Sequence, residues 1–302
     1  MKQGGQEESE IGVRSRKMII INTIPELRQY LHKNRTEGRH IGFVPTMGCL
    51  HQGHCTLIQR SAAENDITVL SIFLNPTQFS CREDYAKYPR RREADIAAAE
   101  EAGATVVFVP DENELYPSGF QTFVDIRELA KPLCGESRPG HFIGMATIVL
   151  KLFNIVRPDK AYFGQKDYQQ VCIVQQMVRD LDMQIEVISC PTVREDSGLA
   201  CSSRNERLTT EEKTKATKIY RLLQEASDSI RAGISDSSKL HGQICQGLEE
   251  AGMEVEYVEI VETKTLHPVQ RIETETLIAV AVFLGTIRLI DNILVSAVDQ
   301  TI

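Results

Sequence analysis

Residues 43–55 read F-V-P-T-M-G-C-L-H-Q-G-H-C and indicate how the whole chain folds. A short apolar run stops at Pro45, and a helical spacing of apolar side chains starts at Thr56. Between them lies a glycine-containing turn that ends in the tetrad H-Q-G-H at 51–54. A strand, a turn and a helix in this order place free backbone N–H groups and two imidazoles at a helix N-terminus, which is typical of a polyphosphate site.

Two other interpretations of this stretch stay open. Histidines near a helix start often cap the helix and bind nothing else. The other interpretation is a metal site, because Cys49, His51, His54 and Cys55 gather four possible ligands in the pattern C-x-H-x-x-H-C. Structural zinc ligands normally come as two separated pairs, and the adjacent His54 and Cys55 do not easily face one ion. The pattern therefore favours phosphate over zinc.

The composition is that of a globular protein without a nucleic-acid or membrane role. The chain has 302 residues and a hydrophobic fraction of 42%, and its length favours two domains. Its net charge of −8 argues against a broad nucleic-acid footprint. It has no apolar run of the roughly 18 residues that a membrane-spanning helix needs. Residues 1–17 are polar, so we expect a disordered tail and no secretory signal. Eight cysteines without a C-x-x-C pair indicate reduced thiols and a cytoplasmic protein.

Strand and helix patterns alternate along the chain. The β-branched run at 67–74 is typical of a strand buried on both faces of a parallel sheet. The alternation predicts an α/β, Rossmann-like doubly wound parallel sheet over 18–191, with its ligand at the carboxyl ends of the strands. Two helices and three strands then predict a smaller C-terminal α+β lid domain over 192–302. The helix after the tetrad is expected at 56–65, and residues 133–144 are expected to form a basic loop.

Polar residues follow the third expected strand in the sequence N-P-T-Q-F at 75–79. Because the carboxyl ends of parallel strands meet at one edge, Asn75 and Gln78 should lie beside the H-Q-G-H turn. Their amides can both donate and accept, which suits a small substrate with hydroxyl and carboxylate groups. An ordinary turn explains the same residues, so this interpretation needs support from elsewhere in the chain.

Three later stretches also combine glycine with charge. Gly164-Gln165-Lys166-Asp167 joins a strand end to a helix start, where Lys166 can neutralise phosphate and Asp167 can accept from ribose hydroxyls or hold the lysine. Residues 196–205 carry two serines and an arginine, a plausible mobile clamp on phosphates. Residues 138–142, R-P-G-H-F, either lie over an anion or form a plain loop.

Together these stretches resemble the pantothenate synthetase (pantoate–β-alanine ligase) family. The resemblance covers residues 18–295, and the family belongs to the H-x-G-H nucleotidyltransferases related to class I aminoacyl-tRNA synthetases. Its marks are V-P-T-M-G-x-L-H-x-G-H (44–54), F-x-N-P-x-Q-F (73–79), Y-P-R (88–90), R-P-G-H-F (138–142), F-G-x-K-D-x-Q-Q (163–170), G-L-A-x-S-S-R-N (198–205) and R-L-I-D-N (288–292).

The resemblance implies a two-step, AMP-forming reaction in coenzyme A precursor biosynthesis. The carboxylate of pantoate attacks the α-phosphate of Mg²⁺-bound ATP to give pantoyl adenylate and pyrophosphate. The amine of β-alanine then attacks the acyl carbon to give pantothenate and AMP. The resemblance also implies a homodimer, which no residue of the sequence indicates by itself.

The resemblance further assigns roles to matching residues. The catalytic residues would be His54 as the proton donor, together with His51, Lys166 and Arg204. Pantoate would be held by Gln78 and Gln170, with Gln78 also facing β-alanine and Asn75 shaping the pocket. The ATP contacts would be Met47, Gly48, Cys49, Leu50, His51, Gln52, Gly53, His54, Gly164, Gln165, Lys166, Asp167, Val193, Cys201, Ser202, Ser203 and Arg204.

The departures from the family pattern are few. Cys201 stands where the family usually has Leu or Met, and we expect little change because this position contributes mainly backbone. Cys49 and Cys55 flank the histidines, so we expect sensitivity to oxidation or to thiol reagents. Side-chain metal ligands are not expected.

Two alternative functions remain. One is a nucleotidylyltransferase that transfers a nucleotide to a phosphorylated substrate, and the other is a non-catalytic zinc or RNA-binding module. The neutral amides of Asn75, Gln78 and Gln170 favour the ligase over the first. The acidic net charge and the lack of a second pair of metal ligands argue against the second.

Overall fold

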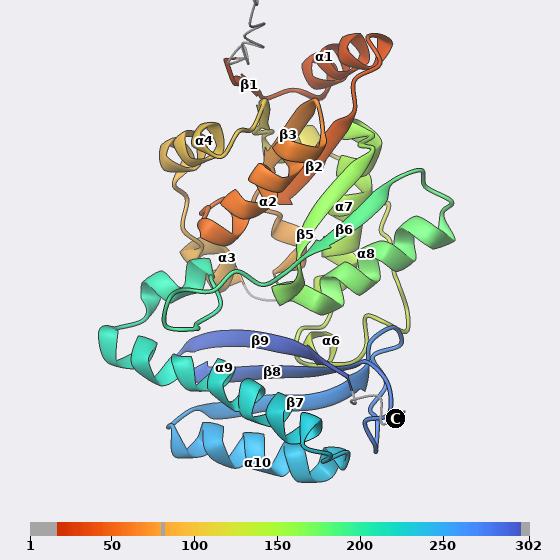
Figure 1. The fold of residues 1–302 in the computed structure, drawn as a ribbon. Helices are drawn as coiled ribbons and strands as arrows, with labels where there is room; N and C mark the ends of the chain where they lie inside the picture. Colours follow the sequence, from red (N-terminus) through yellow and green to blue (C-terminus); the bar gives the residue numbers. More distant parts are fainter. Residues whose placement is uncertain (1–16, 80–81, 297–302) are drawn as a thin grey trace, which may run out of the picture.

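A six-stranded parallel sheet with helices on both faces forms the first part of the molecule (Figure 1). The computed structural model describes residues 17–79 and 82–296, so the expected tail lies outside the described residues except for Lys17. The strand order is β1-β4-β3-β2-β5-β6, which confirms the expected Rossmann-like doubly wound fold. The strands are β1 (Ile19–Ile21), β2 (Ile41–Thr46), β3 (Ile67–Ile72), β4 (Val106–Phe108), β5 (Lys160–Gly164) and β6 (Glu186–Cys190).

The order of the strands reverses between β2 and β5. From β2 the chain moves outward through β3 to β4, and it then crosses to the other side of β2 to form β5 and β6. β2 and β5 pair only at Gly42–Lys160 and Phe43–Ala161. Their remaining residues, which lead to the carboxyl ends, are not paired with each other, so a crevice opens there as expected at a topological switch point.

Apolar side chains fill both faces of this sheet. β3 is buried along five of its six residues, which explains its β-branched sequence. α7 is the most deeply buried helix on its face, and it packs beside α1 and α8. α2 and α4 cover the opposite face. These helices are α1 (Ile24–Thr36), α2 (Gln52–Glu64), α4 (Arg92–Glu101), α7 (His141–Val156) and α8 (Tyr168–Asp180).

A three-stranded antiparallel sheet forms the second part, below the first in Figure 1. Two helices cover one face of this sheet, and its central strand is buried on both faces. The other face packs against the first part, because Leu277 and Ala279 join the apolar core of the parallel sheet. The elements are α9 (Thr210–Arg231), α10 (Ser237–Glu250), β7 (Glu254–Glu262), β8 (Thr276–Leu284) and β9 (Ile287–Val295).

Two expectations about local structure are wrong. α2 begins at Gln52 instead of Thr56, because His51 caps it and makes the tetrad part of the first turn. Residues 133–144 contain the short helix α6 (Cys134–Ser137) and the start of α7, so they do not form one loop. The remaining short elements are α3 (Arg82–Lys87), α5 (Glu112–Leu115), η1 (Pro76–Gln78), η2 (Gln165–Asp167) and η3 (Ser203–Arg207).

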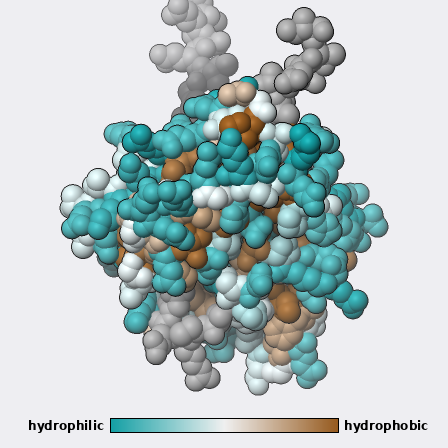
Figure 2. Space-filling model, turned by 90° about the horizontal axis from the view of Figure 1, so that it is seen from below, coloured by the Kyte–Doolittle hydropathy of each residue, from teal (hydrophilic) through white to brown (hydrophobic). Residues whose placement is uncertain are grey.

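The hydropathy of the helices and of the surface bears on contact with a membrane. Over residues 17–79 and 82–296, no helix has both the length and the apolar character needed to cross a membrane. Figure 2 shows the face beyond the second sheet as mostly hydrophilic, with apolar side chains in small separated groups.

Candidate active site

The crevice between β2 and β5 holds a cleft of about 970 Å³, here called the first cleft. Loops from four separate parts of the chain build it, at the carboxyl edge of the parallel sheet. The candidate ATP residues that line it are Met47, His51, Gly53, His54, Gly164, Lys166, Asp167, Val193, Cys201, Ser202, Ser203 and Arg204.

Five of the residues expected to contact ATP do not line this cleft in the described chain: Gly48, Cys49, Leu50, Gln52 and Gln165. Gly48 and Cys49 have positive φ angles of 82° and 52°, so two consecutive left-handed residues turn the chain sharply here. Their role in the free protein is to shape the turn that presents the histidines.

Asp95 on α4 braces this turn and had no signal in the sequence. Its carboxylate accepts hydrogen bonds from Cys49 N at 2.8 Å and from Leu50 N at 2.7 Å. Asp95 is buried, with 4% of its surface exposed, and charge-assisted bonds to backbone N–H groups are strong. It therefore fixes the turn from behind, 45 to 46 residues away along the chain.

The two histidines cap α2 with a reciprocal pair of hydrogen bonds. His51 Nδ1 accepts from Gly53 N at 3.1 Å, and His54 Nδ1 accepts from His51 N at 3.3 Å. Both histidines therefore cap the helix, and the same bonds leave each neutral ring with its proton on Nε2, free to bind a ligand as well. A Cβ on Gly53 would lie 2.9 Å from the His51 ring, so glycine makes room for this arrangement. Each imidazole can then donate from Nε2 to a ligand in the cleft.

Both rings are neutral at physiological pH. Burial, followed by the charge of Lys166, lowers the pKa of His51 to about 4. Burial and the neighbouring His51 lower the pKa of His54 to about 3. In the free site they are therefore hydrogen-bond donors rather than imidazolium acids.

The lowered pKa of His51 makes the fold acid-sensitive. An unfolded histidine titrates near 6.5, so between about pH 6.5 and pH 4 the unfolded chain binds more protons, and the free energy of unfolding falls as the pH falls. The variant His51→Asn keeps a capping oxygen but does not titrate. We expect it to lose about 1–2 kcal/mol less stability than the parent between pH 7 and pH 5. Urea unfolding at both pH values measures this, and equal losses would contradict the neutral capping role.

Lys166 and Asp167 lie opposite the histidines, on the turn between β5 and α8. The Lys166 side chain lines the cleft and has no hydrogen-bond partner among residues 17–79 and 82–296. Burial tends to raise the pKa of Asp167, but Lys166 and Arg204 outweigh it, so the pKa of this carboxyl is lowered. The Asp167 carboxylate therefore stays ionised beside Lys166.

The third group of cleft residues follows a hairpin at 194–200. Cys201 N donates to Val193 O at 2.9 Å, and Ser202 Oγ accepts from Arg204 N at 3.3 Å to cap η3. The Arg204 side chain lines both the first cleft and its neighbour. Two hydroxyls and a guanidinium thus face Lys166 and the histidines across the cleft.

A second cleft of about 950 Å³ adjoins the first. Met47, His54, Gln170 and Arg204 line both, so the two form one continuous space. The second cleft has an apolar wall from α7 and a polar edge from η1. This lining suits a small acid that has an apolar part.

Asn75 positions Gln78 at this polar edge. Asn75 Nδ2 donates to Gln78 Oε1 at 2.9 Å and to Gly144 O at 3.1 Å. Gln78 Oε1 is thereby occupied, so its Nε2 remains as the donor for a carboxylate or hydroxyl oxygen. A Cβ on Gly144 would lie 2.3 Å from Thr77 O, which shows that glycine allows η1 to approach α7 this closely.

Arg138 and His141 hold Gln78 from the other side. His141 Nδ1 donates to Gln78 O at 2.7 Å, and Arg138 Nη1 lies 3.2 Å from His141 Nε2. Burial, and then the charge of Arg138, lowers the pKa of His141 to about 4, so this ring is neutral. Both residues line the second cleft, which favours the anion-facing interpretation of R-P-G-H-F over a plain loop.

The structure argues against the expected reactivity of the active-site thiols. Burial raises the pKa of Cys49, of Cys55 and of Cys201. Because the thiolate is the reactive form, these thiols should react slowly at neutral pH. No group of three or more metal-binding side chains is found in the described part of the chain.

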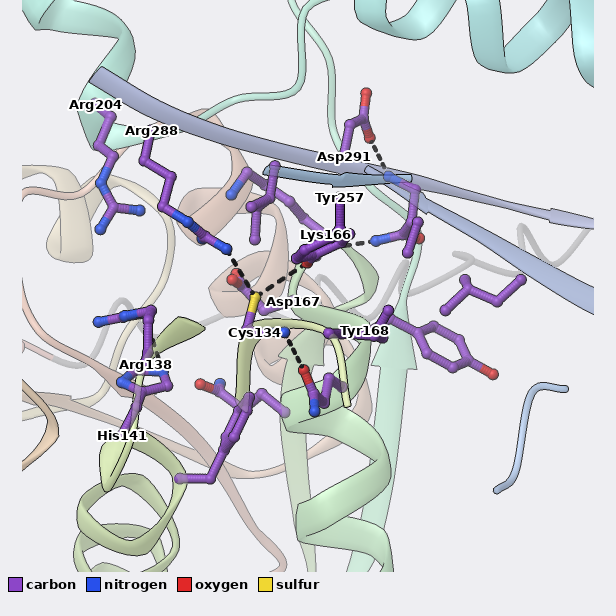
Figure 3. Close-up of a pocket in the computed structure, with 18 residues that line it drawn as sticks. Cys134, Arg138, His141, Lys166, Asp167, Tyr168, Arg204, Tyr257, Arg288 and Asp291 are labelled. Carbon is purple, nitrogen blue, oxygen red and sulfur yellow. Dashed lines mark hydrogen bonds between the residues drawn. The ribbon is translucent and has the colours of Figure 1, made fainter. Parts of the chain in front are cut away.

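A third cavity of about 550 Å³ lies between the two sheets. Figure 3 shows Lys166 and Asp167 at this cavity, beneath the strand that carries Arg288 and Asp291. Cys134 Sγ lies 3.1 Å from Tyr257 Oη and accepts from Arg288 Nη2 at 3.4 Å, which joins α6 to the second sheet. The second sheet therefore closes over the Lys166 turn.

The combined geometry suits transfer of a nucleotide to a carboxylate. A triphosphate in the first cleft would meet two Nε2–H donors, one ammonium, two hydroxyls and one guanidinium. These groups can stabilise the negative charge that grows on phosphate oxygens in a transition state. A carboxylate held by Gln78 in the adjoining cleft would face the same phosphates.

Comparison with protein families gives a match over nearly the whole chain. The family model described as pantoate-beta-alanine ligase matches residues 19–294. The pantothenate synthetase of Caldicellulosiruptor saccharolyticus is 49% identical over 279 residues, covering 92% of this chain and 99% of that protein. The pantothenate synthetase of Acetivibrio thermocellus is 48% identical over 279 residues, covering 92% of this chain and 99% of that protein.

Solved structures agree with the sequence relatives. The pantothenate synthetase of Thermus thermophilus matches with a TM-score of 0.87 and 42% identity, covering 91% of this chain and 99% of that chain. A pantoate-beta-alanine ligase of Francisella tularensis, in complex with Beta-gamma ATP and Beta-alanine, matches with a TM-score of 0.78 and 38% identity. It covers 92% of this chain and 97% of that chain.

Proposed function

The chain belongs to the pantoate–β-alanine ligase family, and on this basis we propose that it condenses pantoate with β-alanine through a pantoyl-adenylate intermediate. ATP binds in the first cleft and pantoate in the second. The pantoate carboxylate attacks the α-phosphate, and pyrophosphate leaves. The amine of β-alanine then attacks the acyl carbon, and AMP leaves as pantothenate forms.

Charge stabilisation is the main contribution of the protein to the first step. We assign His51 and His54 as Nε2–H donors to the phosphates, because their Nδ1 atoms already accept from the backbone. Lys166 and Arg204 supply the positive charge, and Ser202 and Ser203 add hydroxyl donors. The family resemblance describes the residue at His54 as the proton donor, and in a neutral ring that donation is a hydrogen bond from Nε2.

The acyl pocket has a different task, which is orientation. We assign Gln78 and Gln170 to pantoate, with Asn75 holding the Gln78 amide in place. Gln78 also faces the incoming β-alanine. Holding the carboxylate and the phosphate in one continuous space makes the attack effectively intramolecular and limits hydrolysis of the adenylate.

Mg²⁺ fits the site as an ion carried by ATP. Mg²⁺ is usually held by phosphate oxygens, water and one or two carboxylates. Asp167 is a carboxylate on the wall of the first cleft, and the lowered pKa of Asp167 keeps it ionised. We therefore propose that Asp167 would help to hold the ion. Bound there, Mg²⁺ would neutralise charge on the triphosphate.

The observation that carries this proposal is the continuity of the two clefts at His54, Gln170 and Arg204. It would allow a bound carboxylate to lie beside a triphosphate without a barrier between them. The adenylate is tested by exchange of labelled pyrophosphate into ATP without β-alanine. Exchange that requires pantoate supports the intermediate, whereas exchange that appears only with β-alanine would argue for a concerted route.

Replacing Gln78 should separate the two substrates. Gln78→Ala removes the Nε2 donor of the acyl pocket and leaves the first cleft intact. We expect the KM for pantoate to rise about 10-fold or more, the value of a hydrogen bond to a charged group, while the KM for ATP changes little. Steady-state kinetics measure both. Gln246→Ala, on the exposed side of α10, is the control, and a larger effect on ATP would move Gln78 out of the acyl pocket.

The remaining assignments follow from the family and the topology. We propose a boundary between domains at 191–192, because β6 ends the parallel sheet at Cys190 and later residues enter a separate apolar core. The C-terminal unit would act as a lid. We also propose a cytoplasmic homodimer, which light scattering on the purified protein tests.

A further inference from the structure

Two adjacent residues of β9 bind the two segments that carry the positive charges of the first cleft, the Lys166 turn and the hairpin before Arg204. Asn292 Nδ2 donates to Gln165 O at 3.0 Å and to Lys166 O at 2.8 Å. The carboxylate of Asp291 binds Arg194 with both oxygens, at 2.6 and 3.0 Å. The first contact fixes the backbone that carries the Lys166 ammonium, and the second fixes the hairpin that precedes Arg204.

The Arg194 contact extends to the whole hairpin. Arg194 Nη1 also donates to Gly198 O at 3.1 Å, and its guanidinium lies 3.5 Å from the centre of the Tyr220 ring. Arg194 forms a backbone bridge with Ala200, two residues before Ser202. Asp291 is 4% exposed, and a buried bidentate pair of this kind is rigid. The clamp that ends in Arg204 is therefore anchored on β9.

The Asn292 amide is oriented for the Lys166 turn. Its Nδ2 serves two carbonyl groups, while its Oδ1 is buried and has no hydrogen-bond partner in the described chain. Rotating the amide would place Oδ1 against those two carbonyls, so the orientation is fixed.

We propose that Asp291 and Asn292 are positioning residues, which set the distance between the Lys166 ammonium and the Arg204 guanidinium and so control the first chemical step. One peptide link separates the two anchors, so β9 holds the Lys166 turn and the hairpin before Arg204 at a fixed separation. Figure 3 shows Asp291 and Lys166 on facing elements, with β9 above the Lys166 turn. This inference rests on the proposed function.

The matched variants are Asn292→Leu and Tyr168→Phe. Leucine keeps the branched shape of asparagine but removes both bonds to the Lys166 turn. Tyr168 Oη donates to Thr263 O at 3.3 Å, so Tyr168→Phe removes another side-chain bond to a carbonyl between the same two parts. Neither Tyr168 nor Thr263 lines the first or the second cleft. We expect Asn292→Leu to slow pantoate-dependent pyrophosphate exchange about 10- to 100-fold, with the KM for pantoate unchanged. Tyr168→Phe should stay within about 2-fold of the parent, given the modest net value of one neutral hydrogen bond.

A double-mutant cycle separates positioning from general destabilisation. In a Lys166→Ala background, Asn292→Leu should have little further effect, because its influence passes through Lys166. Asp291→Glu should retain more exchange than Asp291→Asn, since it keeps the charged anchor for Arg194. Additive losses in the cycle, or equal losses in Asn292→Leu and Tyr168→Phe, would overturn the inference.

Pyrophosphate exchange by the parent protein is measured first. A parent that exchanges no pyrophosphate refutes the proposed function, and the inference is then tested by calorimetric titration with Mg²⁺-ATP alone. In that case Asn292→Leu should weaken ATP binding about 10-fold relative to Tyr168→Phe. Equal affinities of the two variants would overturn the positioning role.

Discussion

Lys166→Ala should slow adenylate formation about 10²- to 10³-fold and leave the fold intact. The Lys166 ammonium lines the first cleft, and no hydrogen bond to it is found within residues 17–79 and 82–296. Its charge is therefore available for the phosphates, and its removal breaks no hydrogen bond in the described part of the chain, although Asp167 loses a neighbouring positive charge. The loss should fall mainly on kcat, because the charge that Lys166 meets grows as pyrophosphate departs.

Lys160 provides a matched control for this variant. It lies at the amino end of the same strand, β5, where it pairs with Glu64 at 3.1 Å, far from the carboxyl edge. Lys160→Ala should keep nearly full activity, and Lys166→Arg should keep more activity than Lys166→Ala. The exchange of pyrophosphate into ATP measures all three. Activity of Lys166→Ala close to that of the parent would contradict the assigned role.

His54→Ala should reduce the same rate about 10²-fold, with a loss of stability of about 1 kcal/mol. The rate falls because the Nε2–H donor is removed. The stability falls because His54 Nδ1 no longer accepts from His51 N. The loss of rate comes from Nε2 and the loss of stability comes from Nδ1, so the two effects can be separated.

Two further variants, His54→Asn and His54→Gln, separate the effect on the rate from the effect on stability. The short amide of His54→Asn can replace the Nδ1 acceptor, whereas the longer amide of His54→Gln can reach the place of Nε2. We expect His54→Asn to recover thermal stability without the rate, and His54→Gln to recover part of the rate. His32→Ala, an exposed histidine on α1, serves as the control. A rate for His54→Ala within a few-fold of the parent would contradict its role.

Local sequence patterns predicted the parallel sheet and much of the cleft. Buried strands such as β3 are continuous β-branched runs, and glycine turns end them at the carboxyl edge. The sequence predicts that the H-Q-G-H tetrad lies at a helix N-terminus, but the helix starts at Gln52, four residues earlier than expected. The reason is that a histidine cap does not belong to the usual Ser, Thr, Asp and Asn signals.

Long-range contacts could not be predicted from one sequence. Asp95 lies in an alanine-rich helix, and nothing near it shows that its carboxylate braces a turn 45 residues away. Asp291 and Arg194 are 97 residues apart, and Asn292 and Lys166 are 126 apart. The resemblance marked 288–292 as a motif, but only the structure gives it a physical role, because buried polar pairs depend on tertiary packing.

The most direct test of the proposed chemistry follows one oxygen atom. Pantoate labelled with ¹⁸O in its carboxylate is incubated with the protein, ATP, Mg²⁺ and β-alanine, and the nucleotide products are analysed by mass spectrometry. Attack of the carboxylate on the α-phosphate transfers one ¹⁸O to AMP, in step with pantothenate. That result is expected. Formation of ADP with labelled inorganic phosphate, or of unlabelled AMP, would contradict the adenylate route.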